Sequence, residues 1–373
     1  MHIAVNTQLL IENKLEGLGW FGYETLRRIT KNHPEHQFTF IFNQAYSQDF
    51  IFEKNVSAII VGPKYNHPLT WFIKFEILLP RILKKLKPDV YLSLDGWCST
   101  RTNIKTVAVI HDLNFRHFPQ WLPFSFRTYY NIFFPRWAKK ATRLATVSEF
   151  SKQDITASYG IPETKIDVVY NGANEKLSPI NDEKKQKVRA EFTQGNPYFV
   201  FVGATPPRKN LINLFKAFDL FKTQNPNNYK LVLVGAKKWW SESIKQAYEQ
   251  MQFSQDVVFT GRVTTETLND LVAASEAMTY VSLFEGFGIP LLEAMYCETA
   301  IITSQCTSMP EVAQNAAIYV EPTNPQSIAD GMQKIASNPE IRMQLIENGK
   351  IRRNDFSWDA SAQKLWKCIE KAF

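Results

Sequence analysis

Short apolar runs alternate along the chain with longer segments in which apolar and polar residues mix at helical spacing. The runs contain few charges, which is typical of strands that are buried on both faces of a parallel sheet. Examples are HIAVN, FTFIF, TVAVI, YFVFV, KLVLV and AIITS. Because strands and helices alternate in this way, we predict a doubly wound α/β fold.

The alternation begins twice, which indicates two domains. A chain of 373 residues is too long for one ordinary core. We expect a first domain over residues 1–174, a polar linker with a short helix over 175–196, and a second domain over 197–356. A last helix, with Ser357 as its N-cap, is expected over 357–373.

Composition favours a globular protein in a reducing compartment. Hydrophobic residues make up 45% of the chain, and no tract is of low complexity. The four cysteines lack paired or metal-ligand spacing, so neither a disulfide framework nor a zinc site is expected. The first residues lack the pattern of a signal peptide, and no apolar run is long enough for a transmembrane helix. We therefore expect a cytoplasmic location.

The net charge of +7 resides in the first half of the chain. Residues 1–173 hold 21 Lys and Arg against 14 Asp and Glu, whereas the remainder holds 22 of each. Basic residues accompany aromatic ones in two segments of this half, 67–95 and 121–143. Such segments are typical of helices at an anionic membrane surface, although core helices with solvated basic ends fit the same pattern. No nucleic-acid-binding motif accompanies the charge, so we expect no nucleic-acid partner.

The segment EGFGIPLLE, from Glu285 to Glu293, combines a glycine loop with the start of a helix. It follows an apolar run that predicts a strand, and Pro290 suits the first turn of a helix. A helix N-terminus preceded by Gly286 and Gly288 offers backbone N–H groups to a phosphate. The flanking carboxylates would repel that anion, but they can accept hydrogen bonds from sugar and ribose hydroxyls. The spacing therefore indicates a nucleotide-sugar site. In the alternative interpretation, Glu293 only stabilises the helix dipole and Glu285 is a solvated loop residue.

A second candidate for diphosphate binding follows the predicted strand YFVFVG. Gly203 ends this strand, and Arg208 and Lys209 stand just before the next helix. Cations at that place oppose the helix dipole, and a bound anion would offset the repulsion. Two ordinary surface residues are the alternative interpretation.

Two features of the first half point to the crevice side of the first sheet. The run TVAVI continues into His111 and Asp112, and residues at the carboxyl end of a parallel strand face the ligand crevice. The segment GLGWFG, 17–22, precedes a helix expected near 23–29 and matches the G-x-G-x-x-G pattern of dinucleotide-binding enzymes. However, it does not follow its strand directly, and no acidic residue ends the next strand. An NAD-dependent oxidoreductase is therefore a disfavoured alternative.

With EGFGIPLLEAM at 285–295 and PRKN at 207–210, the chain resembles the retaining family-four glycosyltransferases of the GT-B fold. The resemblance implies two Rossmann-like domains with an interdomain cleft. The first domain would serve the acceptor and the second the nucleotide sugar, and the last helix would pack back on the first domain. The resemblance implies catalytic roles for His111, Lys209 and Glu285. The donor-binding residues that it implies are Gly17, Gly19, Asp112, Gly203, Arg208, Lys209, Arg262, Val263, Glu285, Gly286, Phe287, Gly288, Ile289 and Glu293.

On this resemblance, Lys209 and Arg208 neutralise the departing diphosphate, His111 lies close to the donor sugar, and the backbone near Arg262 and Val263 receives the base. The glycines at 17 and 19 let the donor phosphates approach the backbone, although a turn at a helix start explains them as well.

The chain departs from the family pattern at two places. Ala204 stands where some members have a second arginine. Glu298 and Ala300 replace the glycine and proline of a turn after the helix. The first departure concerns the diphosphate site and the second the geometry of the turn.

We therefore predict a retaining hexosyltransferase. It would move a hexose, with mannose preferred, from a nucleotide-diphosphate sugar to a glycan or lipid-linked acceptor in surface polysaccharide synthesis. The sequence contains no Asp-x-Asp metal motif, so neither a metal nor another cofactor is expected. Peripheral contact with the inner face of the cytoplasmic membrane would follow from the basic first half. The alternative from another class is a non-catalytic nucleotide-sugar-binding partner subunit. For the retaining reaction, proton transfer to a phosphate oxygen and double displacement both remain open.

Overall fold

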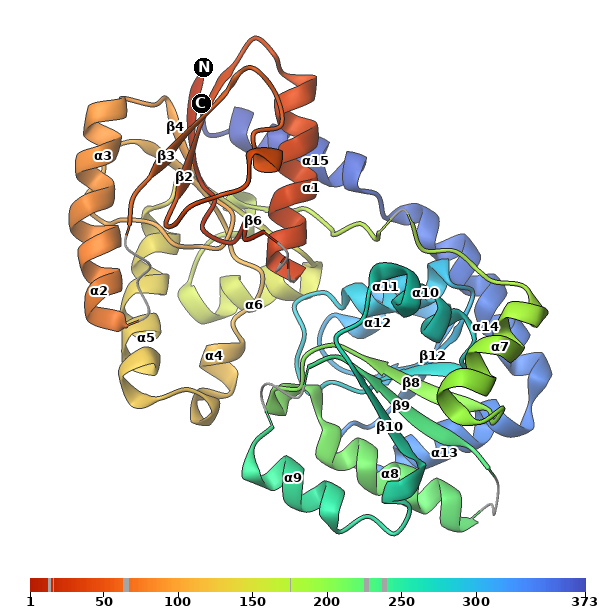
Figure 1. Ribbon diagram of the computed structural model, residues 1–373. Coiled ribbons are helices and arrows are strands. Elements are labelled where there is room, and N and C mark those ends of the chain that lie inside the picture. Colours follow the sequence, from red (N-terminus) through yellow and green to blue (C-terminus); the bar gives the residue numbers. More distant parts are fainter. Residues whose placement is uncertain (13–14, 16, 63–66, 175, 225–227, 237–239) are drawn as a thin grey trace. The chain divides into compact units, whose positions relative to one another are not determined.

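The computed structural model describes residues 1–12, 15, 17–62, 67–174, 176–224, 228–236 and 240–373. The chain forms two units, each built around one sheet (Figure 1). The first unit combines Met1–Asn171 with Ser357–Phe373, and the second comprises Gly172–Phe356. Both sheets are parallel and doubly wound, which confirms the predicted α/β fold class.

Seven strands form the sheet of the first unit. They are β1 (His2–Asn6), β2 (Gln37–Phe42), β3 (Val56–Ile60), β4 (Val90–Ser93), β5 (Lys105–Val109), β6 (Arg143–Thr146) and β7 (Ile166–Val168). Their order is β3-β2-β1-β4-β5-β6-β7, and β1 pairs in register with β2 through Ile3 and Phe38. The order reverses between β1 and β4. In open parallel sheets, ligands bind outside the carboxyl ends of the strands at such a reversal.

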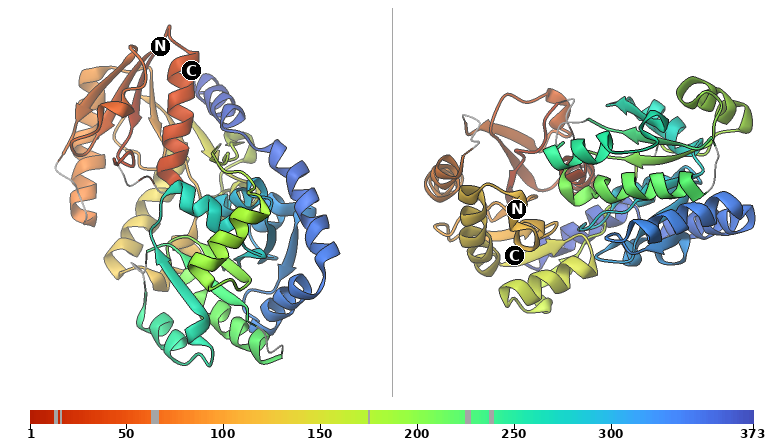
Figure 2. Two further views of the ribbon diagram at one scale, coloured as in Figure 1. Left: turned by 45° about the vertical axis from the view of Figure 1, so that its right-hand side comes forward. Right: turned by 90° about the horizontal axis from the view of Figure 1, so that it is seen from below.

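Helices cover both faces of this sheet. On one face, α1 (Gly17–Asn32) lies beside α15 (Trp358–Glu370) (Figures 1 and 2). Arg28 Nε donates to Asp359 Oδ1 at 2.7 Å and ties the two helices together. The remaining helices of the unit are α2 (Pro68–Phe72), the π-helix η2 (Ile73–Leu78), α3 (Leu79–Leu86), α4 (Asn114–His117), α5 (Phe124–Lys140) and α6 (Glu149–Tyr159), with 3₁₀ turns η1 (Gln48–Phe50), η3 (Pro119–Trp121) and η4 (Glu163–Lys165).

The second unit contains six parallel strands in the order β10-β9-β8-β11-β12-β13. They are β8 (Tyr198–Val202), β9 (Lys230–Val234), β10 (Val257–Gly261), β11 (Ala277–Tyr280), β12 (Ala300–Ser304) and β13 (Ala317–Val320). The helices are α7 (Asp182–Thr193), α8 (Leu211–Gln224), α9 (Glu242–Glu249), α10 (Thr265–Ala273), α11 (Ile289–Tyr296), α12 (Met309–Ala313), α13 (Pro325–Ser337) and α14 (Pro339–Arg352), with 3₁₀ turns η5 (Pro207–Lys209), η7 (Ser254–Asp256), η8 (Gln314–Ala316) and η9 (Arg353–Asp355). Here the order reverses between β8 and β11.

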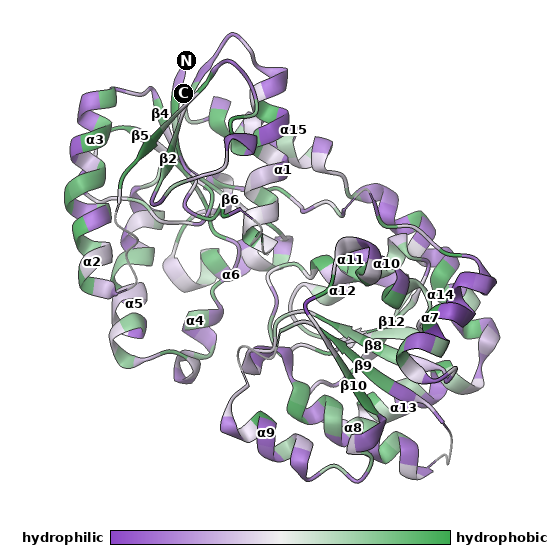
Figure 3. Cartoon of the chain, in the orientation of Figure 1, coloured by the Kyte–Doolittle hydropathy of each residue, from purple (hydrophilic) through white to green (hydrophobic). Residues whose placement is uncertain are grey.

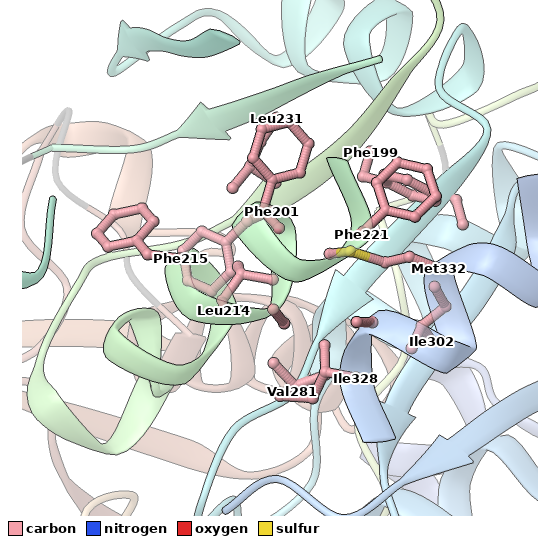
Figure 4. Packing of buried hydrophobic residues seen from close by; sticks show 14 of the residues in the cluster. Phe199, Phe201, Leu214, Phe215, Phe221, Leu231, Val281, Ile302, Ile328 and Met332 are labelled. Atoms are coloured by element: carbon pink, nitrogen blue, oxygen red, sulfur yellow. The ribbon is translucent and has the colours of Figure 1, made fainter. Parts of the chain in front are cut away.

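Aromatic and aliphatic side chains form the core of the second unit. Phe199 and Phe201 of β8 pack with Phe215 and Phe221 of α8, and none of the four is exposed (Figure 4). Figure 3 shows the strands of this sheet as largely hydrophobic, in contrast to the mixed surfaces of the helices. Truncation of such a buried phenylalanine to alanine typically costs about 3–5 kcal/mol, so the sheet is a rigid support for the loops at its edge.

The segment 175–196, expected to be a linker, contains helix α7 within the second unit. Arg189 of α7 pairs with Glu276 at 2.8 Å and donates to the carbonyl of Ala274 at 3.0 Å. These bonds, made just before β11, hold α7 on the unit. The predicted caps at Ser148 and Ser357 are present, since their hydroxyls accept hydrogen bonds from the backbone of Ser151 and Ala360.

The glycine segment GLGWFG differs from its expected structure. Helix α1 begins at Gly17, so the segment lies inside the helix and not in a loop before a helix near 23–29. A Cβ on Gly19 would lie 3.0 Å from the carbonyl oxygen of Leu9, and one on Gly22 would lie 3.3 Å from Leu94 Cδ1. Close packing of α1 therefore explains these two glycines.

Most aromatic rings of segments 67–95 and 121–143 lie in the core of the first unit. Phe75, Tyr129, Phe134 and Trp137 belong to one buried cluster, and Trp137 Nε1 donates to the buried Glu76 at 2.7 Å. This packing fits the alternative of core helices. Leu69 and Phe124 are the most exposed large apolar residues of these segments, at 65% and 73% exposure.

Among the helices of the described residues, none combines the length and the apolar character that crossing a membrane requires.

Candidate active site

The loops that follow β8 and β11 meet at the carboxyl edge of the second sheet, where the strand order reverses. The N–H of Leu283 donates to the carbonyl of Arg208 at 2.8 Å. Asn210, whose φ of +63° is left-handed, donates from Nδ2 to the carbonyl of Val281 at 2.9 Å. These bonds place the PRKN motif directly beside the EGFG motif.

Glycines suit this edge because the backbone takes positive φ values and, at Gly235, comes very close to a neighbouring strand end. Gly203 follows β8 with a φ of +137°, and Gly235 follows β9 with a φ of +144°. A Cβ on Gly235 would lie 2.1 Å from the carbonyl oxygen of Gly203, which is far inside van der Waals contact. The predicted site residue Gly203 thus lies at the end of β8, where no side chain covers its own backbone.

Glu285 lies between the two cations of the PRKN motif. Its Oε2 is 2.6 Å from Arg208 Nη1, and its Oε1 is 2.7 Å from Lys209 Nζ. Glu285 is 5% exposed and Lys209 is 7% exposed, so solvent and salt screen the pair of Lys209 with Glu285 little. One carboxylate facing two cations leaves one positive charge for a bound anion.

Tyr280, the last residue of β11, positions Lys209. Its hydroxyl accepts a hydrogen bond from Lys209 Nζ, and the same nitrogen lies 4.4 Å from the centroid of its ring. Tyr280 is fully buried, and a Cβ on Gly288 would lie 3.6 Å from its ring. The side chain therefore sits between the lysine and the glycine loop.

The two glutamates of the EGFGIPLLE segment differ in charge state. Burial alone would raise the pKa of Glu285, but the charges of Arg208 and Lys209 outweigh it and lower this pKa to about 2. Glu293 is half-buried on α11, and desolvation raises its pKa to about 7 although Lys209 acts in the opposite direction. Glu285 is hence ionised at neutral pH, whereas Glu293 titrates near neutral pH.

The glycine loop leads into α11 as the sequence predicts. Gly288 precedes the helix with a φ of +100°, and Pro290 lies in its first turn. Ser308 Oγ lies within hydrogen-bond distance of the carbonyls of Glu285 and Phe287, at 2.9 and 3.0 Å. The ring of Phe287 packs edge-on against Phe356 at 5.6 Å. These contacts hold Gly286, Phe287, Gly288 and Ile289 in a fixed backbone at the helix N-terminus.

Arg262 and Val263 come directly after β10, at the same edge of the sheet. Arg262 is exposed and Val263 is half-buried. The N–H of Gly235 donates to the carbonyl of Gly261 at 2.9 Å and links the ends of β9 and β10. The second unit thus brings all predicted donor residues from 203 onwards to one edge or to the helix beside it.

His111 follows β5 at the carboxyl edge of the first sheet. Its Nε2 lies 2.9 Å from the carbonyl oxygen of Leu94, so Nε2 carries the hydrogen and Nδ1 is the acceptor of the ring. Burial lowers the pKa of His111, and the ring of Phe21 meets it edge-on at 5.0 Å. His111 is therefore a neutral, oriented hydrogen-bond acceptor.

Asp112 and Gly19 have structural contacts in the first unit. Asp112 Oδ1 accepts from the backbone N–H and Nδ2 of Asn114, at 3.0 and 2.6 Å, where α4 starts. Gly17 is exposed at the first residue of α1, whereas Gly19 is buried. Asp112 therefore closes an Asx turn just before α4.

The sequence reasoning missed a polar network where the first sheet reverses its order. Asp95, just after β4, accepts from Asn6 Nδ2 at 2.9 Å and Gln8 Nε2 at 2.6 Å. Lys74 Nζ donates to Gln8 Oε1 at 2.6 Å, and burial lowers the pKa of Lys74 to about 8. Asn6 and Asp95 each end an apolar run, which is a signal that could have identified them. Tyr280 gave no such signal, because its place in an apolar strand does not show that its hydroxyl bonds to Lys209, which is distant in the sequence.

Two family descriptions match successive parts of the chain. The family "Glycosyltransferase Family 4" matches residues 17–177, and "Glycosyl transferases group 1" matches residues 182–352. The O-antigen chain mannosyltransferase B of Escherichia coli is 26% identical over 292 residues, which cover 76% of each chain. The O-antigen chain mannosyltransferase RfbU of Salmonella typhimurium is 28% identical over 295 residues, which cover 78% of this chain and 76% of the relative.

A solved structure has the same fold. The crystal structure of HepE from Anabaena in complex with UDP-glucose superposes with a TM-score of 0.77 at 16% identity, over 99% of both chains. The family matches span both units, and the resemblance predicted from the EGFG and PRKN motifs is confirmed. The chain therefore belongs to the glycosyltransferases of the GT-B fold, with a family-4 first part and a group-1 second part.

Proposed function

We propose that this glycosyltransferase moves a hexose from a nucleotide-diphosphate sugar to a glycan or lipid-linked acceptor, with retention of anomeric configuration. The observation that carries the proposal is the pairing of Glu285 with Arg208 and Lys209 at the carboxyl edge of the second sheet. The excess positive charge and the N-terminus of α11 suit a diphosphate. The carboxylate suits the hydroxyl groups of the attached sugar.

In this mechanism, Lys209 and Arg208 act on the leaving group. As the bond to the sugar breaks, negative charge grows on the diphosphate, and cations that are already in place stabilise it most in the transition state. Their present partner Glu285 keeps them oriented, so little reorganisation is needed. Since these cations supply the charge, the proposed reaction needs no metal ion or other cofactor.

The other site residues would bind the donor and handle its hydroxyls. Glu285 would orient the sugar ring, and Glu293 would bind the ribose. A carboxyl group that titrates near pH 7 can donate hydrogen bonds to the ribose hydroxyls or accept them. His111 would accept a hydrogen bond from the sugar through Nδ1. Retention would follow if a phosphate oxygen took the acceptor proton on the face from which the diphosphate leaves.

The comparisons support mannose as the transferred sugar. Both curated relatives are O-antigen mannosyltransferases, whereas HepE was crystallised with UDP-glucose. We assign the enzyme to surface polysaccharide synthesis on the cytoplasmic side of the membrane. The structure gives no support to an NAD-dependent oxidoreductase, since GLGWFG is part of helix α1 and its Gly19 and Gly22 serve close packing.

Peripheral membrane contact is a further part of the proposal. Leu69 and Phe124 are exposed apolar residues, and Arg127 lies 5.4 Å from the ring of Phe124. An apolar residue next to a cation is typical of interfacial anchors. Binding to liposomes should therefore require anionic lipid and weaken with salt; binding that is indifferent to both would refute this contact.

An assay of mannose transfer tests the function. The enzyme is given GDP-mannose and lipid-linked glycan acceptors in the presence of EDTA, and mass spectrometry detects the product. Lys209→Met should lower kcat by about 10²–10³, the range for loss of one preorganised donor. Lys222→Met is the matched control, because Lys222 is also buried and paired, with Asp256 at 2.9 Å, but lies on α8 outside the proposed site. Equal turnover losses in the two variants, or none in Lys209→Met, would contradict the diphosphate role.

A further inference from the structure

The turn between α1 and β2 gathers three side chains that are common metal ligands, His33, Glu35 and His36. Glu35 Oε1 lies 3.7 Å from His33 Nδ1 and 3.2 Å from His36 Nε2. All three ligand atoms lie within 4.8 Å of one another. Around a tetrahedral zinc ion with bonds of about 2.0–2.2 Å, neighbouring ligand atoms are about 3.3 Å apart. The two measured separations are close to that value.

The indole of Trp366, on α15, orients both histidine rings. The ring centroids of His33 and His36 lie 3.7 and 5.1 Å from that of Trp366, at interplanar angles of 17° and 22°. The two imidazoles are inclined by only 16° to each other, with centroids 6.1 Å apart. Because the lone pair of an imidazole nitrogen lies in the ring plane, two nearly parallel rings on one indole can direct nitrogens to the same carboxylate.

A buried amide holds the backbone of this turn. Asn55 Nδ2 lies 3.1, 3.1 and 3.0 Å from the carbonyl oxygens of Thr30, His33 and His36. His36 Nδ1 lies 3.0 Å from the amino group of Met1. In its uncharged form this amine can accept a hydrogen bond from Nδ1–H, which leaves the lone pair of Nε2 for an ion. Fixed ligands of this kind lose little entropy on binding an ion.

We propose that His33, Glu35 and His36 form a binding site for a divalent metal ion of the zinc type. Two imidazoles and one carboxylate suit such an ion, and water would complete its coordination. The site lies just before the amino end of β2, whereas the ligand crevice of a parallel sheet lies at the carboxyl ends. The ion would strengthen the turn that stacks on Trp366, and it would have no part in glycosyl transfer.

The test uses the full-length protein after treatment with EDTA and dialysis. Calorimetric titration with ZnCl₂ should show one equivalent bound by the native protein. Glu35→Gln should weaken this binding at least about tenfold, since it replaces a charged ligand carboxylate on an exposed side chain by a neutral amide without disturbing the core. His36→Gln should do the same and serves as the second ligand variant.

A matched control is His117→Gln, because His117 Nε2 also pairs with a carboxylate, that of Asp154, at 2.8 Å. This variant should keep the affinity of the native protein for zinc. Zinc should also raise the unfolding temperature of the native protein and of His117→Gln, but not of the ligand variants. Absence of stoichiometric binding, or equal zinc affinity in Glu35→Gln and native protein, would overturn the proposal.

Discussion

At the scale of single residues, the donor site depends on groups that hold Lys209 in place. Tyr280→Phe keeps the ring 4.4 Å from Lys209 Nζ but removes the hydroxyl that accepts its hydrogen bond. We expect kcat to fall about tenfold, as for the loss of about 1.4 kcal/mol of transition-state stabilisation, while the KM for the donor changes little. Steady-state kinetics measure both constants. A change in KM alone would contradict the positioning role of Tyr280.

The two glutamates should respond to pH in opposite ways. The pKa of Glu285 is lowered by folding, so its contribution to stability is present above the ordinary value of 4.5 and is lost as pH falls towards about 2. The pKa of Glu293 is raised, so its ionisation destabilises the folded protein progressively as pH rises from 4.5 through about 7. Glu293→Gln should therefore raise the unfolding temperature at pH 8 but not at pH 4. A gain at pH 4 of the same size would show that the carboxylate charge is not the cause.

These residue-scale features were predictable to different degrees. The sequence predicted one site for Glu285, Arg208 and Lys209, and the structure brings the three together, because loops after two parallel strands meet where the order of a sheet reverses. It could not predict that Glu285 pairs with both cations, since this depends on the left-handed turn at Asn210. Nor could it predict Tyr280, because its position in an apolar run indicates burial and nothing about its hydroxyl.

At the scale of elements, the strand ends of the second sheet depend on close backbone contact. Gly235→Ala should destabilise the protein by more than 2 kcal/mol, roughly, because its Cβ would lie 2.1 Å from the carbonyl oxygen of Gly203. Gly195→Ala is the control: Gly195 also has a positive φ, of +83°, but nothing lies within 4 Å of its added Cβ. This control should lose only about 1 kcal/mol. Denaturant unfolding compares them, and equal losses would refute the steric explanation.

Most elements followed from the pattern of apolar residues. The six apolar runs named from the sequence form β1, β2, β5, β8, β9 and β12, because strands buried in a parallel sheet contain few charges. The start of α1 was not predicted, because the glycines of GLGWFG were read as a loop. In the structure they allow α1 to approach Leu9 and Leu94, a contact that no local pattern contains.

At the scale of the whole molecule, the last helix belongs to the first unit although it follows the second in sequence. Trp358, Leu365 and Ile369 of α15 are buried there. Deletion of residues 357–373 should therefore speed hydrogen exchange in α1, β6 and β7, which α15 contacts, and leave β8 and β9 protected. Mass spectrometry of exchanged peptides would show this. Unchanged protection in α1 would contradict the assignment of α15 to the first unit.

The edge of the second sheet should bind a nucleoside diphosphate sugar through Arg208, Lys209 and Glu285. The most direct measurement is calorimetric titration of the metal-free protein with GDP, UDP and NADH, repeated with Lys209→Met. We expect binding of GDP or UDP, no binding of NADH, and a clear loss of affinity in the variant. Binding of NADH alone, or nucleotide affinity that is unchanged in Lys209→Met, would show that this edge does not bind the donor through Lys209.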